Sequence, residues 1–138
     1  MLSNTVVRRI EWGDCDPAGI VFNPNYLSFF DHCTTMLYEA AGWPKQIMVQ
    51  KFGIVGCPLV ETRAKFLAPC SFGDEVSITS TVADVRNSSF DIRHELSKGG
   101  KLCVEGFETR VWAGRDPETG RLRSTPLPPE VVARFRGE

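Results

Sequence analysis

The amino-acid sequence predicts an α+β domain in which one long helix covers an antiparallel sheet of about five strands. A single apolar stripe at helical spacing runs from residue 24 to residue 41, and strand-like segments joined by turn signals follow from residue 59 onward. Strands and helices do not alternate as they would in a parallel sheet, so hairpin pairing is expected. The 138 residues match the length of one ordinary domain, and we expect residues 1–138 to form a single unit.

The first third of the chain contains one strand and the helices. Alternating side chains over Thr5–Trp12 predict a half-buried strand. The long helix is expected to begin at Pro24, because proline suits the first helical turn and the Asn23 side chain can cap free backbone amides. Gly42 supplies its C-terminal stop, and a shorter helix is expected over Pro44–Phe52.

The remaining residues are dominated by strand patterns. Gly99-Gly100 is typical of a hairpin turn. A short strand is expected near Leu122, and one or two helical turns are expected over Pro129–Phe135. Consecutive antiparallel strands are therefore expected in this part of the chain. The four longer strand segments are Leu59–Leu67, with one face in water, Glu75–Val85, Phe90–Leu96 and Lys101–Ala113.

Composition excludes several classes of partner. Sixteen basic and seventeen acidic side chains leave a net charge of -1, so we expect no nucleic-acid partner. The first residues lack the apolar core of a signal peptide, and no span approaches the roughly 20 apolar residues of a membrane helix, so we expect a cytoplasmic protein without membrane contact. Five widely spaced cysteines without a C-x-x-C pair predict free thiols and no metal site.

The segment Gly13–Val21 is the strongest candidate for a chemical site. It places Asp14 and Asp16 in a tight loop just before a helix N-terminus. Unpaired amides at a helix start can stabilise a carbonyl oxygen that gains negative charge during acyl transfer, and a nearby carboxylate can attack that carbonyl or activate water. The alternative is that both aspartates only cap turns, which is common for this residue type.

The run from Ile10 to Val21, followed by Pro24-Asn25-Tyr26 and Asp31, closely resembles the 4-hydroxybenzoyl-CoA thioesterase family of hotdog proteins. The likeness continues through Gly53–Gly56, Ser89-Phe90 and Arg121–Arg123. The resemblance implies a hotdog fold, homodimers that assemble into homotetramers, and an acyl-CoA substrate bound at subunit interfaces. It implies hydrolysis of an aromatic, 4-hydroxybenzoyl-like acyl-CoA without metal or organic cofactor.

The same resemblance assigns roles to individual residues. Asp16 matches the catalytic carboxylate, as nucleophile or general base, and the backbone amide of Asn23 matches the group that polarises the carbonyl. Asp31 matches an acidic residue near the acyl pocket that can accept a hydrogen bond from a substrate hydroxyl, with a solvated helix carboxylate as the alternative. Arg86 and Arg123 match basic positions that contact CoA phosphates, and each could equally be a surface arginine.

Other assignments are weaker. Glu39 is a rival for Asp16, because some hotdog thioesterases carry their carboxylate on the central helix. His32 and His94 lack a serine nucleophile motif, and His94 fits a hydrogen-bonded packing residue. An enoyl-CoA hydratase would need a histidine where this sequence has Val21. A non-catalytic acyl-CoA binding module is the remaining alternative, and thiol release from a panel of acyl-CoAs separates it from an enzyme.

Overall fold

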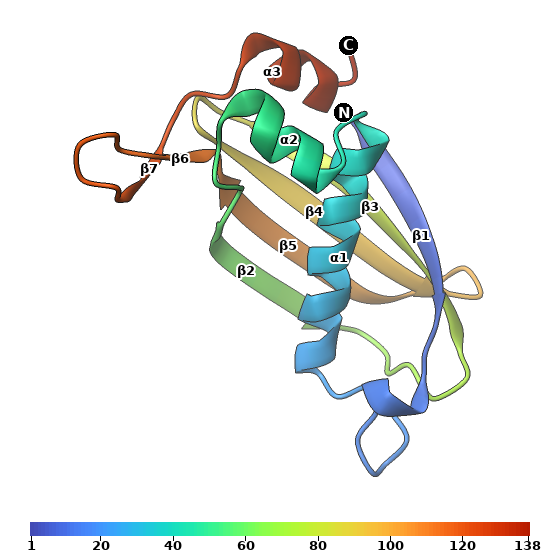
Figure 1. Ribbon diagram of the computed structural model, residues 1–138. Coiled ribbons are helices and arrows are strands. Elements are labelled where there is room, and N and C mark those ends of the chain that lie inside the picture. Colours follow the sequence, from blue (N-terminus) through green and yellow to red (C-terminus); the bar gives the residue numbers. More distant parts are fainter.

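A five-stranded antiparallel sheet forms the frame of the computed structural model, which describes all 138 residues (Figure 1). The order across the sheet is β1-β3-β4-β5-β2, and every neighbouring pair is antiparallel. The predicted α+β class is therefore confirmed. The strands are β1 (Ser3–Arg9), β2 (Leu59–Phe66), β3 (Glu75–Val85), β4 (Ser89–Lys98) and β5 (Lys101–Val111); β6 (Ala113–Arg115) and β7 (Leu122–Ser124) form a separate small hairpin.

Strands β3, β4 and β5 form the predicted consecutive hairpins. Gly99 and Gly100 turn the chain between β4 and β5 with φ angles of 56° and 79°, which glycine adopts without steric cost. Register places Ser80 opposite His94 and His94 opposite Gly106, so these three residues share one face of the sheet. That face is the one covered by the long helix, because Gly106 lies directly against a helix side chain, Phe30.

Three helices complete the chain, α1 (Pro24–Ala40), α2 (Lys45–Phe52) and α3 (Pro129–Phe135). Helix α1 crosses the concave face of the sheet on the side of β1 and β3, while α2 and α3 close one end (Figure 1). Helix α2 ends at Gly53, whose φ of 65° lies in the left-handed region that glycine adopts at helix C-termini. None of the three combines the length and the unbroken apolarity that crossing a bilayer requires.

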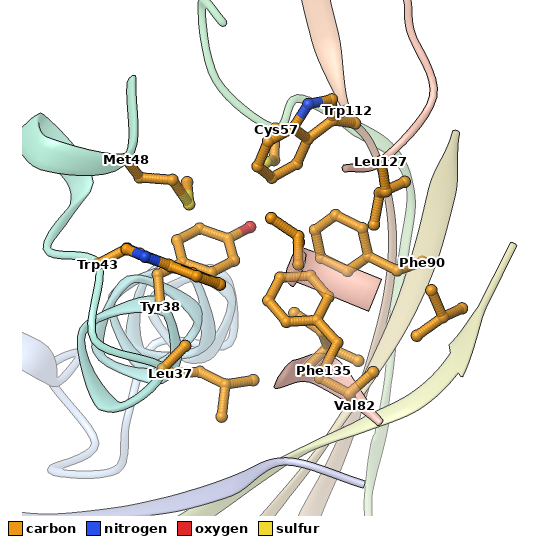
Figure 2. Close-up of a cluster of buried hydrophobic side chains, with 14 of the residues drawn as sticks. Leu37, Tyr38, Trp43, Met48, Cys57, Val82, Phe90, Trp112, Leu127 and Phe135 are labelled. Atoms are coloured by element: carbon orange, nitrogen blue, oxygen red, sulfur yellow. The ribbon is translucent and has the colours of Figure 1, made fainter. Parts of the chain in front are cut away.

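The core between α1 and the sheet is divided into two apolar clusters. One lies near the N-terminal half of α1 and includes Phe29, Phe30 and Ile78. The other lies near α2 and α3, where aromatic side chains such as Tyr38 and Phe135 pack together (Figure 2). All residues that are both polar and buried form a third group, Thr34, Ser80, His94, Glu108 and Arg110.

Two predicted strands differ in the structure. Strand β1 ends at Arg9 instead of Trp12, because residues 12–14 form a turn of 3-10 helix and the Trp12 side chain is 61% exposed. Strand β2 has water on both faces and not on one, with Val60 61% and Phe66 48% exposed. It is an edge strand that α1 reaches through Tyr26, whose ring centroid lies 5.6 Å from that of Phe66, and its apolar side chains stay largely exposed within one chain.

Candidate active site

The loop between β1 and α1 carries both carboxylates of the sequence motif, and Asp14 holds its shape. Asp14 Oδ2 accepts hydrogen bonds from Arg8 Nη2 at 2.9 Å and from the Glu11 backbone N–H at 2.8 Å. Its backbone carbonyl accepts two more, from Asn25 Nδ2 at 2.9 Å and from the Phe22 N–H at 3.0 Å. Asp14 therefore stabilises the loop and joins it to the start of α1, which is a structural role.

Asp16 is half-buried in the same loop, and the protein uses only one of its carboxylate oxygens. Oδ1 accepts a hydrogen bond from the Ala18 N–H at 2.8 Å, the geometry of an Asx turn. Gly19, with φ of 82°, closes the turn by donating its N–H to the Asp16 carbonyl at 2.9 Å. The second oxygen, Oδ2, has no hydrogen-bond partner in the chain. The carboxylate is thus fixed in orientation with one oxygen free.

The start of α1 differs from the prediction in one respect. The Asn23 side chain does not cap the helix, because its backbone already has helical angles, φ -46° and ψ -43°, and the cap prediction is wrong. The nearby Asn25 side chain bonds the loop instead. The Asn23 backbone N–H donates to no acceptor in the chain. A mainly apolar cleft of roughly 190 Å³ lies beside it, lined among others by Tyr26 and Phe66.

Asp31 lies two turns further along α1 and belongs to a buried polar cluster that the sequence had not indicated. Its Oδ1 accepts a hydrogen bond from Arg110 Nη2 at 2.8 Å. Arg110 Nε in turn donates to Glu108 Oε1 at 2.8 Å, and the Thr34 hydroxyl donates to the same oxygen at 2.7 Å. His94 Nε2 is 3.3 Å from Glu108 Oε2. The cluster extends from the interior to a carboxylate that is 59% exposed.

The charges within this cluster compensate one another. Burial alone would raise the pKa of Glu108, but the contacts with His94 and Arg110 outweigh it and lower this pKa to about 2. Burial alone would lower the pKa of Arg110, whereas the carboxylates of Glu108 and Asp31 raise it. Glu108 and Arg110 are therefore an ion pair at neutral pH. Charged residues on the covered face of β5 were the signal in the sequence that could have revealed them.

Arg86 and Arg123 lie far from Asp16 within one chain. The Asp16 loop contacts the turn just before β3, where the Phe72 N–H donates to the Gly19 carbonyl at 3.0 Å. Arg86 follows the opposite end of β3, which has 11 residues and therefore extends roughly 30 Å. Arg86 pairs with Asp84 and Asp91. Arg123, on β7, lies 3.6 Å from Asp116.

The rival groups are also separated from the Asp16 loop. Glu39 is exposed near the end of α1, 16 residues after Asn23, which corresponds to roughly 24 Å along the helix. His32 is exposed on the helix surface. His94 is a buried packing residue, as predicted, with its ring stacked on Phe30 at 4.7 Å and Ser80 Oγ 2.7 Å from Nδ1.

Comparisons with known proteins agree with this architecture. Residues 10–135 match the family model described as thioesterase-like superfamily. The chain is 38% identical over 137 residues to the 4-hydroxybenzoyl-CoA thioesterase of Pseudomonas sp. (strain CBS-3), a match that covers 94% of this chain and 95% of the relative. It is 30% identical over 104 residues to a 1,4-dihydroxy-2-naphthoyl-CoA hydrolase of Prochlorococcus marinus subsp. pastoris, covering 72% and 69%.

The solved structures add a likeness in three dimensions. A crystal structure of a 4-hydroxybenzoyl-CoA thioesterase variant in complex with 4-hydroxybenzoyl-CoA matches with a TM-score of 0.88 at 34% identity, over 98% of this chain and 99% of that chain. The hotdog fold that the sequence motif predicted is thereby confirmed.

Proposed function

Because the chain belongs to the thioesterase-like superfamily and is a hydrolase of CoA thioesters, we propose that it hydrolyses an aromatic, 4-hydroxybenzoyl-like acyl-CoA. Asp16 is the reacting carboxylate in this proposal. The observation that carries this assignment is the free Oδ2 of Asp16 in a loop joined to a helix start whose Asn23 N–H is also unpaired. A nucleophile or base and a hydrogen-bond donor are the two groups that acyl transfer from a thioester requires.

In the proposed reaction, water adds its oxygen to the thioester carbonyl carbon and the carbon–sulfur bond breaks, giving the free acid and CoA thiol. Asp16 either removes a proton from the attacking water or attacks first and forms an anhydride that water then opens. The Asn23 N–H donates to the carbonyl oxygen as negative charge develops there. No metal ion or organic cofactor takes part, so turnover should persist after dialysis against a chelator.

We propose that the complete site lies between copies of the chain, in a homodimer that assembles further into a homotetramer. Asp31 is eight residues after Asn23 on the same helix, roughly 12 Å along its axis. We assign the Asp31 that meets the acyl group to a second copy of the chain, in keeping with the interface site that the resemblance implies. The uncovered edge strand β2, with Val60 and Phe66 exposed, is the surface through which two copies would pair.

The proposed phosphate contacts fit the same arrangement. Arg86 and Arg123 are too distant from Asp16 of their own chain, so we assign them to CoA bound at a neighbouring copy's loop. Arg86 is already paired with two carboxylates, which leaves Arg123, held by a single long contact, as the more available cation. Five free cysteines suit a reducing compartment, and we expect the enzyme to act in the cytoplasm.

The decisive experiment compares Asp16→Asn with Glu39→Gln in a thiol-release assay on aromatic and aliphatic acyl-CoAs. Asn preserves an oxygen that can accept from the Ala18 N–H, so the variant should fold normally yet lose roughly 100-fold or more of turnover. Glu39→Gln should retain full turnover. Loss of activity in Glu39→Gln with retention in Asp16→Asn would move the site to the helix, and binding without hydrolysis by the unmodified protein would make it an acyl-CoA binding module.

A further inference from the structure

The five buried polar residues of this protein form one connected cluster that lies between its two apolar clusters. On the sheet, Ser80 and His94 occupy the row between Ile78 and Val82, which belong to different apolar clusters. Burying ionised side chains is costly, and well-packed apolar residues in the same place are often at least as stable. The cluster therefore calls for a reason other than stability.

Arg110 connects this interior to the surface. Its side chain is 8% exposed, and each part of the guanidinium has its own acceptor. Nε donates to Glu108 Oε1 at 2.8 Å, Nη1 to the Cys57 carbonyl at 2.9 Å and Nη2 to Asp31 Oδ1 at 2.8 Å. Glu108 and the Cys57 carbonyl already fix the plane of the guanidinium group. The contact with Arg110 therefore orients the Asp31 carboxylate, and Asp31 is not needed to orient Arg110.

Asp31 is held at one oxygen only. Oδ1 is bonded to Arg110, while Oδ2 has no partner in the chain and the side chain is 59% exposed. An ordinary surface carboxylate samples several rotamers, and ordering it on binding costs free energy. A carboxylate already ordered by a buried arginine avoids that cost and accepts a strong, charge-assisted hydrogen bond.

The surface next to this arginine can receive an acyl group. Arg110 lines a cleft of roughly 250 Å³ together with the apolar side chains of Val55 and Leu122 and with the charged Lys45. Apolar side chains next to a few polar groups are a common composition of a small-molecule subsite.

The geometry points to Arg110 as a positioning residue that orients the Asp31 carboxylate to select acyl groups carrying a hydrogen-bond donor, such as a phenolic hydroxyl. This inference rests on the proposed thioesterase function and deepens it. Arg110 acts on the selection through Asp31, whose unpaired Oδ2 is the atom that would accept the hydrogen bond from the acyl group. Glu108, held by Thr34 and His94, keeps the guanidinium in place and completes the chain of contacts.

The test is the ratio of kcat/KM for 4-hydroxybenzoyl-CoA to that for benzoyl-CoA, which differ only in the hydroxyl. Asp31→Ala should lower this ratio roughly 10- to 100-fold, the usual contribution of a hydrogen bond to a charged acceptor. Arg110→Lys keeps the charge opposite Glu108 but cannot reach three acceptors, so it should lower the same ratio several-fold. The double variant should lose no more than Asp31→Ala alone.

Arg93→Lys, on the uncovered face of β4, is the matched control and should leave the ratio unchanged. Arg110→Gln is the stronger perturbation, and if it fails to fold, the Arg110→Lys ratio decides. A wild-type ratio in folded Arg110→Lys, with a reduced ratio in Asp31→Ala, would overturn the positioning role. A wild-type ratio in Asp31→Ala would overturn it as well, without affecting the thioesterase assignment, which fails only if the unmodified protein releases no thiol from either substrate.

Discussion

Gly106 offers a sharp test of how α1 packs on the sheet. A Cβ added at this position would lie 2.5 Å from two ring carbons of Phe30, whereas carbon atoms normally approach to about 3.5–4.0 Å. The ring cannot easily move, because it is only 2% exposed and stacks on His94 with an interplanar angle of 8°. The φ of Gly106 is not in the left-handed region, so the backbone conformation does not require glycine at this position. Glycine is needed on β5 because a side chain there would collide with α1.

Gly106→Ala should consequently destabilise the protein although alanine restricts the unfolded chain. Overpacking costs typically ~1–3 kcal/mol, and the reduced entropy of the unfolded state returns ~0.4–1 kcal/mol. We expect a net loss of about 1–2 kcal/mol, which for a chain of this length lowers Tm by roughly 3–10 °C. Thermal and urea unfolding at one fixed protein concentration measure this directly, since assembly would otherwise shift the midpoint.

The matched control is Gly114→Ala on β6, where the added Cβ would lie at an ordinary 3.6 Å from the Thr125 methyl. This variant should be neutral within about 0.5 kcal/mol. The double variant Gly106→Ala/Phe30→Leu should lose less free energy of unfolding than the sum of the two single variants, because leucine leaves room for the added methyl group. A Gly106→Ala protein as stable as its Gly114→Ala counterpart would refute this packing between β5 and α1.

Two further predictions concern buried polar groups. Since the pKa of Glu108 is lowered from 4.5 to about 2, ionised Glu108 stabilises the fold by roughly 3 kcal/mol above pH 4.5, and this contribution is lost as the pH falls toward 2. Urea unfolding at several pH values should therefore show a free energy of unfolding that falls less steeply with decreasing pH in Glu108→Gln than in the unmodified protein. Equal pH dependence in the two proteins would contradict the ion pair. The Tyr38 hydroxyl points into an apolar cluster without a hydrogen-bond partner (Figure 2), so Tyr38→Phe should leave Tm unchanged or raise it by a few degrees, and a clear loss of stability would reveal a partner for that hydroxyl.

The local elements of this protein could be predicted because short-range physics determines them. The hairpin at Gly99-Gly100 needs backbone angles that glycine supplies, and the helix from Pro24 follows from its apolar spacing and its proline start. One local element was nevertheless predicted wrongly. Trp12 fits the strand alternation, yet the Asp14 side chain bonds the Glu11 amide and turns the chain away.

The site divides in the same way. The family, the loop with Asp16 and the helix start at Asn23 could be predicted from the sequence, because these residues are contiguous and their spacing is encoded along one short segment. The folded chain was needed to show that Asp14 stabilises the loop and that Arg110 holds Asp31. Asp31 and Arg110 are 79 residues apart in the chain, and nothing local specifies their contact. The antiparallel register and the packing of α1 bring them together, so only the folded chain defines that part of the site.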